Sequence, residues 1–216
     1  METCRQISIK NSMRVRLSLL ALVALLLVGC IDYGHREFPT IPCEVEPDEV
    51  FGRHYTAADF QIWQIDEHIF RNLSVTAEDS AARLDLFHAV YADNHNGKAL
   101  GRYYWIAVDT INYKMVCLEG NSPIIDGSSI AQASVKEEWG QRVVAFEFAK
   151  EHHAKWLNIT SENVGHHLAI MLGDRLLCVP EVVSEIANGK CSFNTGLQED
   201  EQCALSLILN KNVENK

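Results

Sequence analysis

Residues 160–180 have the sequence TSENVGHHLAIMLGDRLLCVP, in which two apolar runs flank a Gly-Asp pair. A two-residue turn of this composition joins antiparallel strands, so the stretch predicts a hairpin of Leu168–Leu172 and Arg175–Val179. Upstream, Glu151–Asn163 follows the helical period, and Gly165 suits the left-handed residue that ends a helix. The stretch therefore predicts a helix followed by a β-hairpin.

Strands and helices alternate on both sides of this stretch. Further strands are predicted at Phe60–Ile65, Arg102–Val108, Tyr113–Leu118, Val143–Phe148 and Lys190–Asn194. Further helices are predicted at Ala77–Tyr91, with Thr76 as its cap, and at Leu197–Leu209. Together these elements predict an α+β fold, an antiparallel or mixed sheet with helices packed on one face, built as two small α+β units in tandem.

The N-terminus has the order of a signal peptide. Basic residues precede an apolar run, Leu17–Val28, which is too short for the roughly 20 residues of a membrane-spanning helix. The run closes on Gly29-Cys30 and resembles the bacterial lipobox, which implies cleavage after residue 29 and lipid attachment, palmitate included, at Cys30. An ordinary secretory signal with an accidental cysteine is the alternative, and Met13 is a second candidate start.

Localisation is expected at the cell envelope. Several acyl chains hold a protein stably on a membrane. Ile31 stands where an aspartate would retain an enterobacterial lipoprotein at the inner membrane, although Asp32 follows it. The pattern favours the inner leaflet of the outer membrane, with the protein facing the periplasm.

Charge and composition limit the classes of partner. Removal of residues 1–29 takes away four basic residues and Glu2, which changes the net charge from −10 to −13. Such a surface repels nucleic acid and anionic lipid headgroups. Since 47% of the residues are apolar, the chain is expected to fold around a real core.

Four regions are predicted along the chain. Residues 1–29 are the signal peptide, and residues 30–50, rich in proline and acidic residues, are expected to be a tether. Residues 51–117 form an N-terminal α+β unit, and residues 118–210 form a second α+β domain.

Five cysteines remain after acylation of Cys30. They are Cys43, Cys117, Cys178, Cys191 and Cys203. An oxidising compartment favours one or two disulfides, whereas cysteine in apolar runs also occurs as a buried thiol. No Cys-x-x-Cys spacing indicates a redox or zinc site, and the pairing stays open.

An ordered series of motifs in residues 118–209 resembles the head part of the first large periplasmic domain of SecD, the auxiliary subunit of the bacterial Sec protein-export machine. The motifs are Pro123–Gly127, a short helical turn at Ile130–Ala133, the strand Val144–Phe148, the run 160–180, Ile186–Gly189, and Gly196 before the acidic helix start Glu199–Glu201. His166, His167, Cys178 and Cys191 depart from the family pattern.

The resemblance implies the fold and a capacity to hold a polypeptide segment. The membrane-embedded carboxylates of the family's proton-driven motor are absent, so the chain is not expected to be a complete SecD. Residues 51–117 lie outside the resemblance.

The sequence offers no chemistry for catalysis or for a cofactor. Adjacent histidines, as in His152-His153 and His166-His167, point to different sides and do not supply two ligands to one metal ion. No Gly-x-Ser-x-Gly elbow and no phosphate-binding glycine loop is present. Paired carboxylates, as in Asp66-Glu67, stand at segment edges, where helix caps explain them. We expect no catalytic residue, metal, cofactor or small-molecule substrate.

A binding surface is the remaining prediction. An open sheet edge accepts an extended chain as an added strand, and exposed aromatic residues strengthen such a surface. Tyr103, Tyr104 and Trp105 are consecutive in a strand, so at least one faces away from the core, whereas Trp63 and Trp156 are expected inside. We expect a non-enzymatic lipoprotein that binds a polypeptide or protein partner, accessory to protein export. The alternatives are a structural or assembly lipoprotein and an envelope hydrolase.

Overall fold

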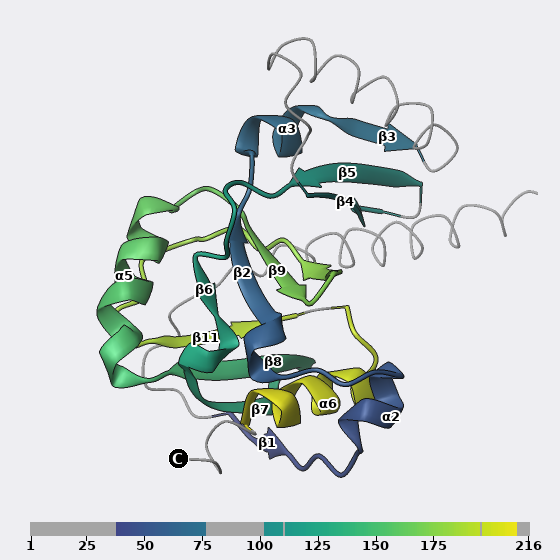
Figure 1. Cartoon of the computed structure of the whole chain (residues 1–216), viewed down its shortest axis with the longest axis vertical. Helices are drawn as coiled ribbons and strands as arrows, with labels where there is room; N and C mark the ends of the chain where they lie inside the picture. The colour runs from purple at the N-terminus through teal and green to yellow at the C-terminus, as the bar shows by residue number, and fades with distance from the viewer. Residues whose placement is uncertain (1–37, 77–101, 110, 195, 211–216) are drawn as a thin grey trace, which may run out of the picture.

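The computed structural model describes residues 38–76, 102–109, 111–194 and 196–210, and these residues form three antiparallel sheets (Figure 1). The first sheet has the order β1 (Thr40–Ile41), β7 (Ile130–Glu138), β8 (Gln141–Phe148), β11 (Lys190–Phe193). The second has the order β10 (Arg175–Cys178), β9 (Leu168–Leu172), β2 (Phe60–Gln64), β6 (Ile125–Asp126). The third has the order β3 (Ser74–Thr76), β5 (Asn112–Cys117), β4 (Tyr103–Ala107).

Short helices connect and cover the sheets. The α-helices are α2 (Pro47–Phe51), α3 (Glu67–Asn72), α5 (His153–Glu162) and α6 (Glu199–Asn210). The 3-10 helices are η1 (Ala57–Asp59), η2 (Gly127–Ser129) and η3 (Lys150–His152). None of the helices in the described part is long and apolar enough to cross a bilayer.

The second sheet is the middle layer and is buried on both faces. On one face, Phe60 of β2 lies 5.6 Å from Phe146 of β8 and 6.0 Å from Phe193 of β11, measured between ring centroids. On the other face, Trp63 and Met171 belong to a second apolar cluster under the third sheet. Burial on both faces explains why β9 is a continuous apolar run rather than an alternating one.

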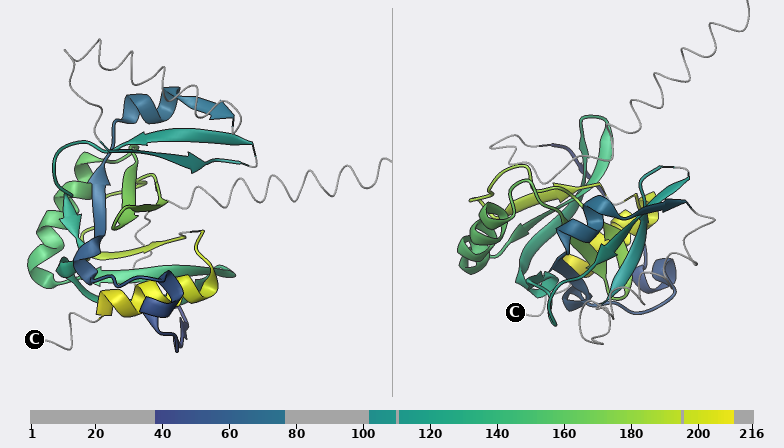
Figure 2. Two further views of the ribbon diagram at one scale, coloured as in Figure 1. Left: turned by 45° about the vertical axis from the view of Figure 1, so that its right-hand side comes forward. Right: turned by 90° about the horizontal axis from the view of Figure 1, so that it is seen from above.

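Two helices close the main core from outside. Trp156 of α5 packs against Phe148 at 4.9 Å between ring centroids and is 1% exposed. Helix α6 lies along β7 and β8, and its buried Leu205 and Leu209 belong to the main core (Figure 2). Three acidic residues in its first turn complement the positive end of the helix dipole.

Much of the predicted secondary structure is confirmed, and so is the α+β class. The β4–β5 and β9–β10 hairpins form, and Gly173 has the positive φ, 60°, of the predicted tight turn. Trp63 and Trp156 are both buried, as expected. Residues 1–29, Cys30 and the helix predicted at Ala77–Tyr91 lie outside the described residues.

The tether prediction is wrong for the described part of residues 30–50. Thr40 and Ile41 pair with β7, Pro47 is buried, and Cys43 forms a disulfide with Cys203 on α6. The proline-rich segment has no periodic pattern because it is fixed by contacts with distant residues rather than by local structure.

The helical turn predicted at Ile130–Ala133 is also wrong, because these residues begin β7. Ile130 pairs with Phe148 and Ala133 with Phe146, and both residues point into the main core. The helical turn lies one step earlier, at η2, where the Asp126 carboxylate accepts a hydrogen bond from the Ser128 N–H at 2.8 Å.

The predicted boundary at 117/118 does not separate two sheets. Strand β2 lies between β9 and β6, so residues from both sides of that boundary share one sheet. Gly127 of η2 also approaches Ala57 of η1 closely.

Candidate polypeptide-binding edge

Strand β4 is the outer strand of the third sheet among the described residues, and its ladder with β5 fixes the direction of each backbone group. The Leu118 N–H donates to the Arg102 carbonyl at 2.8 Å, and the Val108 N–H donates to the Asn112 carbonyl at 2.9 Å. Hydrogen-bonded pairs alternate along an antiparallel ladder, so Tyr104 and Ile106 also bond to β5.

The backbone groups of the alternate residues of β4 point away from β5. By the same alternation, Trp105 and Ala107 direct their N–H and C=O groups away from β5, toward the side of the sheet on which no further described strand lies. These outward groups have the spacing that an added strand uses for pairing.

The side chains of β4 alternate between two apolar clusters without being buried by either. Tyr104 and Ile106 pack against the second cluster, while Tyr103 and Trp105 pack against Ile69, Met115 and Cys117 on the opposite face of the third sheet. None of the five β4 residues is fully buried, and Ala107 is exposed. The aromatic strand therefore keeps contact area for a partner on both faces.

The half-buried apolar surface continues onto the neighbouring sheet. Leu176 of β10 and Val179, which follows that strand, pack on the same cluster as Tyr104 and Ile106. We call these four residues the edge strip. It joins the outer strands of two sheets, since β10 is an outer strand of the second sheet among the described strands.

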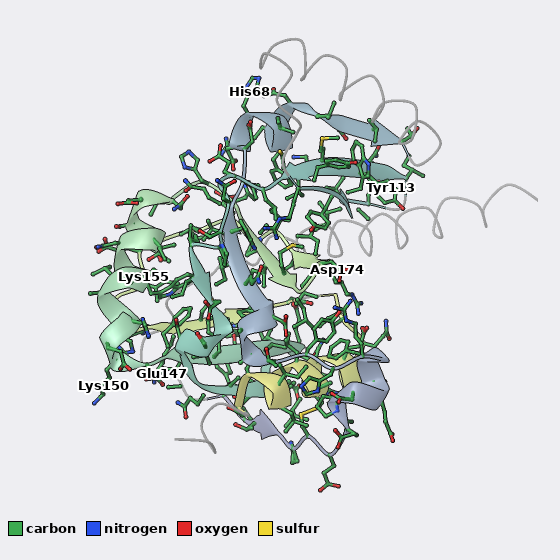
Figure 3. The ribbon with its side chains drawn as sticks, viewed as in Figure 1. His68, Tyr113, Glu147, Lys150, Lys155 and Asp174 are labelled. Carbon is green, nitrogen blue, oxygen red and sulfur yellow. A yellow bond between two sulfur atoms is a disulfide. The ribbon has the colours of Figure 1, made fainter. Side chains whose placement is uncertain are left out.

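Charged groups line the strip. The Arg102 guanidinium lies 4.5 Å from the Trp63 ring centroid. An Arg53–Asp174 ion pair of 3.1 Å is formed at the β9–β10 turn, and Figure 3 shows Asp174 at the tip of that hairpin. Burial raises the pKa of Tyr104, Arg102 opposes the rise and Asp174 adds to it, so the phenol is neutral at pH 7.

Several other polar residues that the sequence analysis considered have hydrogen-bonding partners within the fold. Asp66 caps α3 by accepting a hydrogen bond from the Ile69 N–H at 2.9 Å, as predicted. His153 Nε2 lies 2.9 Å from the Phe148 carbonyl oxygen, and His167 contacts Glu67. In the described ranges, no group of three or more histidine, cysteine or acidic side chains is placed to hold a metal ion.

The second half of the chain is similar in sequence to a known protein family. The family model of the SecDF P1 head subdomain matches residues 107–213. Protein translocase subunit SecD of Sebaldella termitidis is 38% identical over 72 residues, which is 33% of this chain and 18% of the relative. SecD of Thermobaculum terrenum is 33% identical over 86 residues, 39% of this chain and 16% of the relative.

Other relatives are more distant. SecDF of Thermus thermophilus is 27% identical over 88 residues, 40% of this chain and 12% of the relative. A solved structure of a SecDF membrane component that enhances protein export gives a TM-score of 0.47 at 17% identity, covering 96% of this chain and 89% of that chain. The crystal structure of SecDF in its super-membrane-facing form gives a TM-score of 0.46 at 14% identity, covering 96% of this chain and 27% of that chain.

The chain thus matches less than a fifth of the length of these three curated relatives. The family match begins at the end of β4 and includes all of β5, eleven residues before the start that the motifs predicted. The predicted resemblance is confirmed. This chain contains a SecD P1 head-like domain, which the family model matches over residues 107–213.

Proposed function

We propose that this protein is a non-enzymatic lipoprotein of the bacterial cell envelope that binds an extended polypeptide along β4, in a role accessory to protein export. The observation that carries the proposal is the outward row of backbone groups at Trp105 and Ala107 beside the edge strip. The relatives are named as subunits of a protein translocase, which supports a polypeptide as the ligand.

The geometry suits recognition by strand addition. An added strand gains main-chain hydrogen bonds that do not depend on its sequence, and its alternate side chains contact the apolar face. Tyr104 and Ile106 occupy that face, with Leu176 and Val179 alongside. Weak selectivity for apolar segments is the expected consequence.

The envelope location rests on Cys30 and is supported by the cysteines of the folded part. We propose acylation at Cys30 and an outer-membrane position facing the periplasm. The Cys43–Cys203 disulfide is of the kind that persists in an oxidising compartment such as the periplasm.

Ala107 provides a sharp test of strand addition. In Ala107→Pro, the ring replaces an outward N–H and leaves the bonds to β5 intact, and proline is tolerated at such edge positions. Ala107→Val is the matched control, because it keeps the N–H and favours the strand. Binding of a fluorescent, permanently unfolded polypeptide is measured by anisotropy.

We expect Ala107→Pro to lose at least about tenfold in affinity, and Ala107→Val to bind as the wild type does. Equal binding by all three proteins contradicts strand addition at β4. No binding by the wild type favours a scaffold role in envelope assembly.

The anchor has its own test. Mass spectrometry of the membrane fraction compares wild type with Cys30→Ala after expression in a bacterium. An N-terminal acylated Cys30 in the wild type alone supports the lipoprotein, whereas an unacylated mature form in both contradicts it.

A further inference from the structure

The turn between β7 and β8 carries an exposed tryptophan in a conformation that disfavours it. Glu138 pairs with Gln141, which leaves Trp139 and Gly140 as a two-residue turn with φ of 54° and 76°. Asparagine, aspartate or glycine normally occupies the first position, because a bulky side chain is strained there. Trp139 is nevertheless 64% exposed, so core packing does not explain its presence.

A second aromatic residue lies beside it. The Phe38 ring lies edge-on to Trp139 at 5.8 Å between ring centroids. Pairing of Thr40 with Lys136, and the hydrogen bond from the Glu137 N–H to the Pro39 carbonyl, hold this segment against the hairpin. The aromatic pair therefore marks the point where the N-terminal segment joins the fold.

The chain length between this point and the proposed anchor is short. Phe38 follows Cys30 by eight positions, which span at most about 26–29 Å when fully extended. A tether that reached residue 50 would allow the domain to stand much farther from the bilayer, but β1 fixes the chain from Thr40 onward. An acylated Cys30 thus keeps Phe38 within about 29 Å of the lipid attachment site, a distance from which the Phe38–Trp139 pair can reach the headgroups.

We propose that Trp139 and Phe38 insert into the interface of the phospholipid bilayer that holds the Cys30 anchor. This inference rests on the acylation proposed above. Tryptophan favours the headgroup region, where its ring is in an apolar setting and its N–H is hydrated. The favourable free energy of inserting the ring would offset the conformational cost of the positive φ at Trp139.

The β7–β8 turn and β4 belong to different sheets. The first sheet, with β1 and β7, lies at one end of the molecule and the third sheet lies at the other, in both side views (Figures 1 and 2). The proposed bilayer contact and the proposed polypeptide-binding edge therefore belong to sheets at opposite ends of the molecule.

The charges around the pair favour zwitterionic lipid. Lys136 and Glu137 precede the turn with opposite signs, the buried Glu138 carboxylate accepts a hydrogen bond from Ser192, and Arg142 is paired with Glu199. The strongly acidic chain disfavours an anionic surface. We therefore expect stronger insertion into phosphatidylcholine than into phosphatidylglycerol bilayers.

The test uses the full acylated protein, purified and reconstituted into phosphatidylcholine vesicles with and without brominated acyl chains, which quench tryptophan fluorescence. Trp139→Asn removes the ring and suits the left-handed turn, so its thermal midpoint is expected to equal or exceed that of the wild type. Trp105→Phe, a half-exposed tryptophan on β4, is the matched control.

We expect bromolipid quenching in the wild type and in Trp105→Phe, and loss of most of the quenched emission in Trp139→Asn. Equal quenching in Trp139→Asn and wild type, or quenching of Trp139 by aqueous iodide instead of bromolipid, overturns the inference. The mass of the same sample separates the two proposals. Acylated protein without Trp139 quenching contradicts only the insertion, whereas unacylated protein contradicts the anchor and the insertion with it.

Discussion

Glu67 and His167 join the two halves of the sequence through a double contact. Glu67 Oε2 accepts the backbone N–H of His167 at 3.1 Å, and Oε1 lies 2.9 Å from Nδ1 of the same residue. Arg71 donates to Oε1 at 2.5 Å and also reaches the Gly165 carbonyl at 2.6 Å. Helix α3 is thereby fixed to the segment that leads into β9.

Glu67→Gln tests the contribution of this carboxylate. Burial raises the pKa of Glu67, but the hydrogen bonds from Arg71 and His167 outweigh it, and the pKa lies below its usual value of 4.5. The unfolded chain binds the proton more readily, so the stabilisation is present above about pH 4.5 and is lost as the pH falls through the folded pKa.

At pH 7 we expect Glu67→Gln to lower the free energy of unfolding by about 1–2 kcal/mol, measured by urea denaturation. The difference from wild type should shrink below pH 4. Glu162→Gln, an exposed glutamate on α5, is the control and should show no loss. A Glu67→Gln deficit that persists undiminished at pH 3 would contradict the electrostatic explanation.

The Cys43–Cys203 disulfide makes a second prediction. It spans 160 positions and fixes the N-terminal segment to α6. Crosslinking so long a loop restricts the unfolded chain, and its loss is expected to cost about 2–5 kcal/mol. Cys43→Ser with Cys203→Ser should therefore melt well below the wild type in a thermal scan.

Dithiothreitol provides the internal control for this pair. The reductant should lower the wild-type midpoint toward that of the double variant and leave the double variant unchanged. A further fall in the double variant on reduction would mean that another disulfide carries part of the stability.

The β4–β5 and β9–β10 hairpins and helices α5 and α6 were predictable because their signals are local. Apolar runs around Gly173-Asp174 determine β9 and β10, and an acidic first turn marks α6. Strand β7 was missed because small and polar residues from Ala131 to Ser134 obscure its alternation, and a register shift between Ile130 and Gln132 breaks it further. The extended conformation of β7 is determined by its pairing with β8 rather than by an alternating pattern in its own sequence.

The long-range features had no local signal. Insertion of β2 between β9 and β6 depends on both faces of β9 being apolar, which the sequence allows but does not assign. The position of β4 at the edge of the described part of the third sheet likewise follows from the sheet order. The run Tyr103–Trp105 indicated exposed aromatics, yet only the ladder with β5 shows which backbone groups face outward.

Gly127 tests the close contact between the sequence halves. A Cβ at this position would lie 2.3 Å from the Ala57 carbonyl oxygen and 3.0 Å from Leu209 Cδ2. Because the nearest obstacle is backbone, Gly127→Ala should cost about 1–3 kcal/mol through forced displacement of η1. Lys155→Ala, at an exposed position of α5, is the control in the same urea series. Equal urea midpoints for the two variants would show that η1 moves away from a Cβ at position 127 at no cost in stability.

Cys117 reports whether the β4–β5 pair stays closed. It lies opposite Tyr103 in the ladder, is 5% exposed, and has a pKa raised to about 11 by burial and by the charges of Asp66 and Glu119. Alkylation requires the thiolate, which is then only about a thousandth of the population at pH 8. Iodoacetamide should label Cys117 at least about 100-fold more slowly in the native protein than in urea.

The same labelling separates a blocked edge from an unfolded sheet. Ala107→Pro removes an outward N–H, so Cys117 should stay as protected as in the wild type, whereas Ile106→Pro removes a donor to β5 and should speed the labelling. Peptide mass spectrometry follows the modified cysteine. If Ala107→Pro also exposes Cys117, its loss of polypeptide binding would reflect disruption of the third sheet, and recognition at β4 would lose its support.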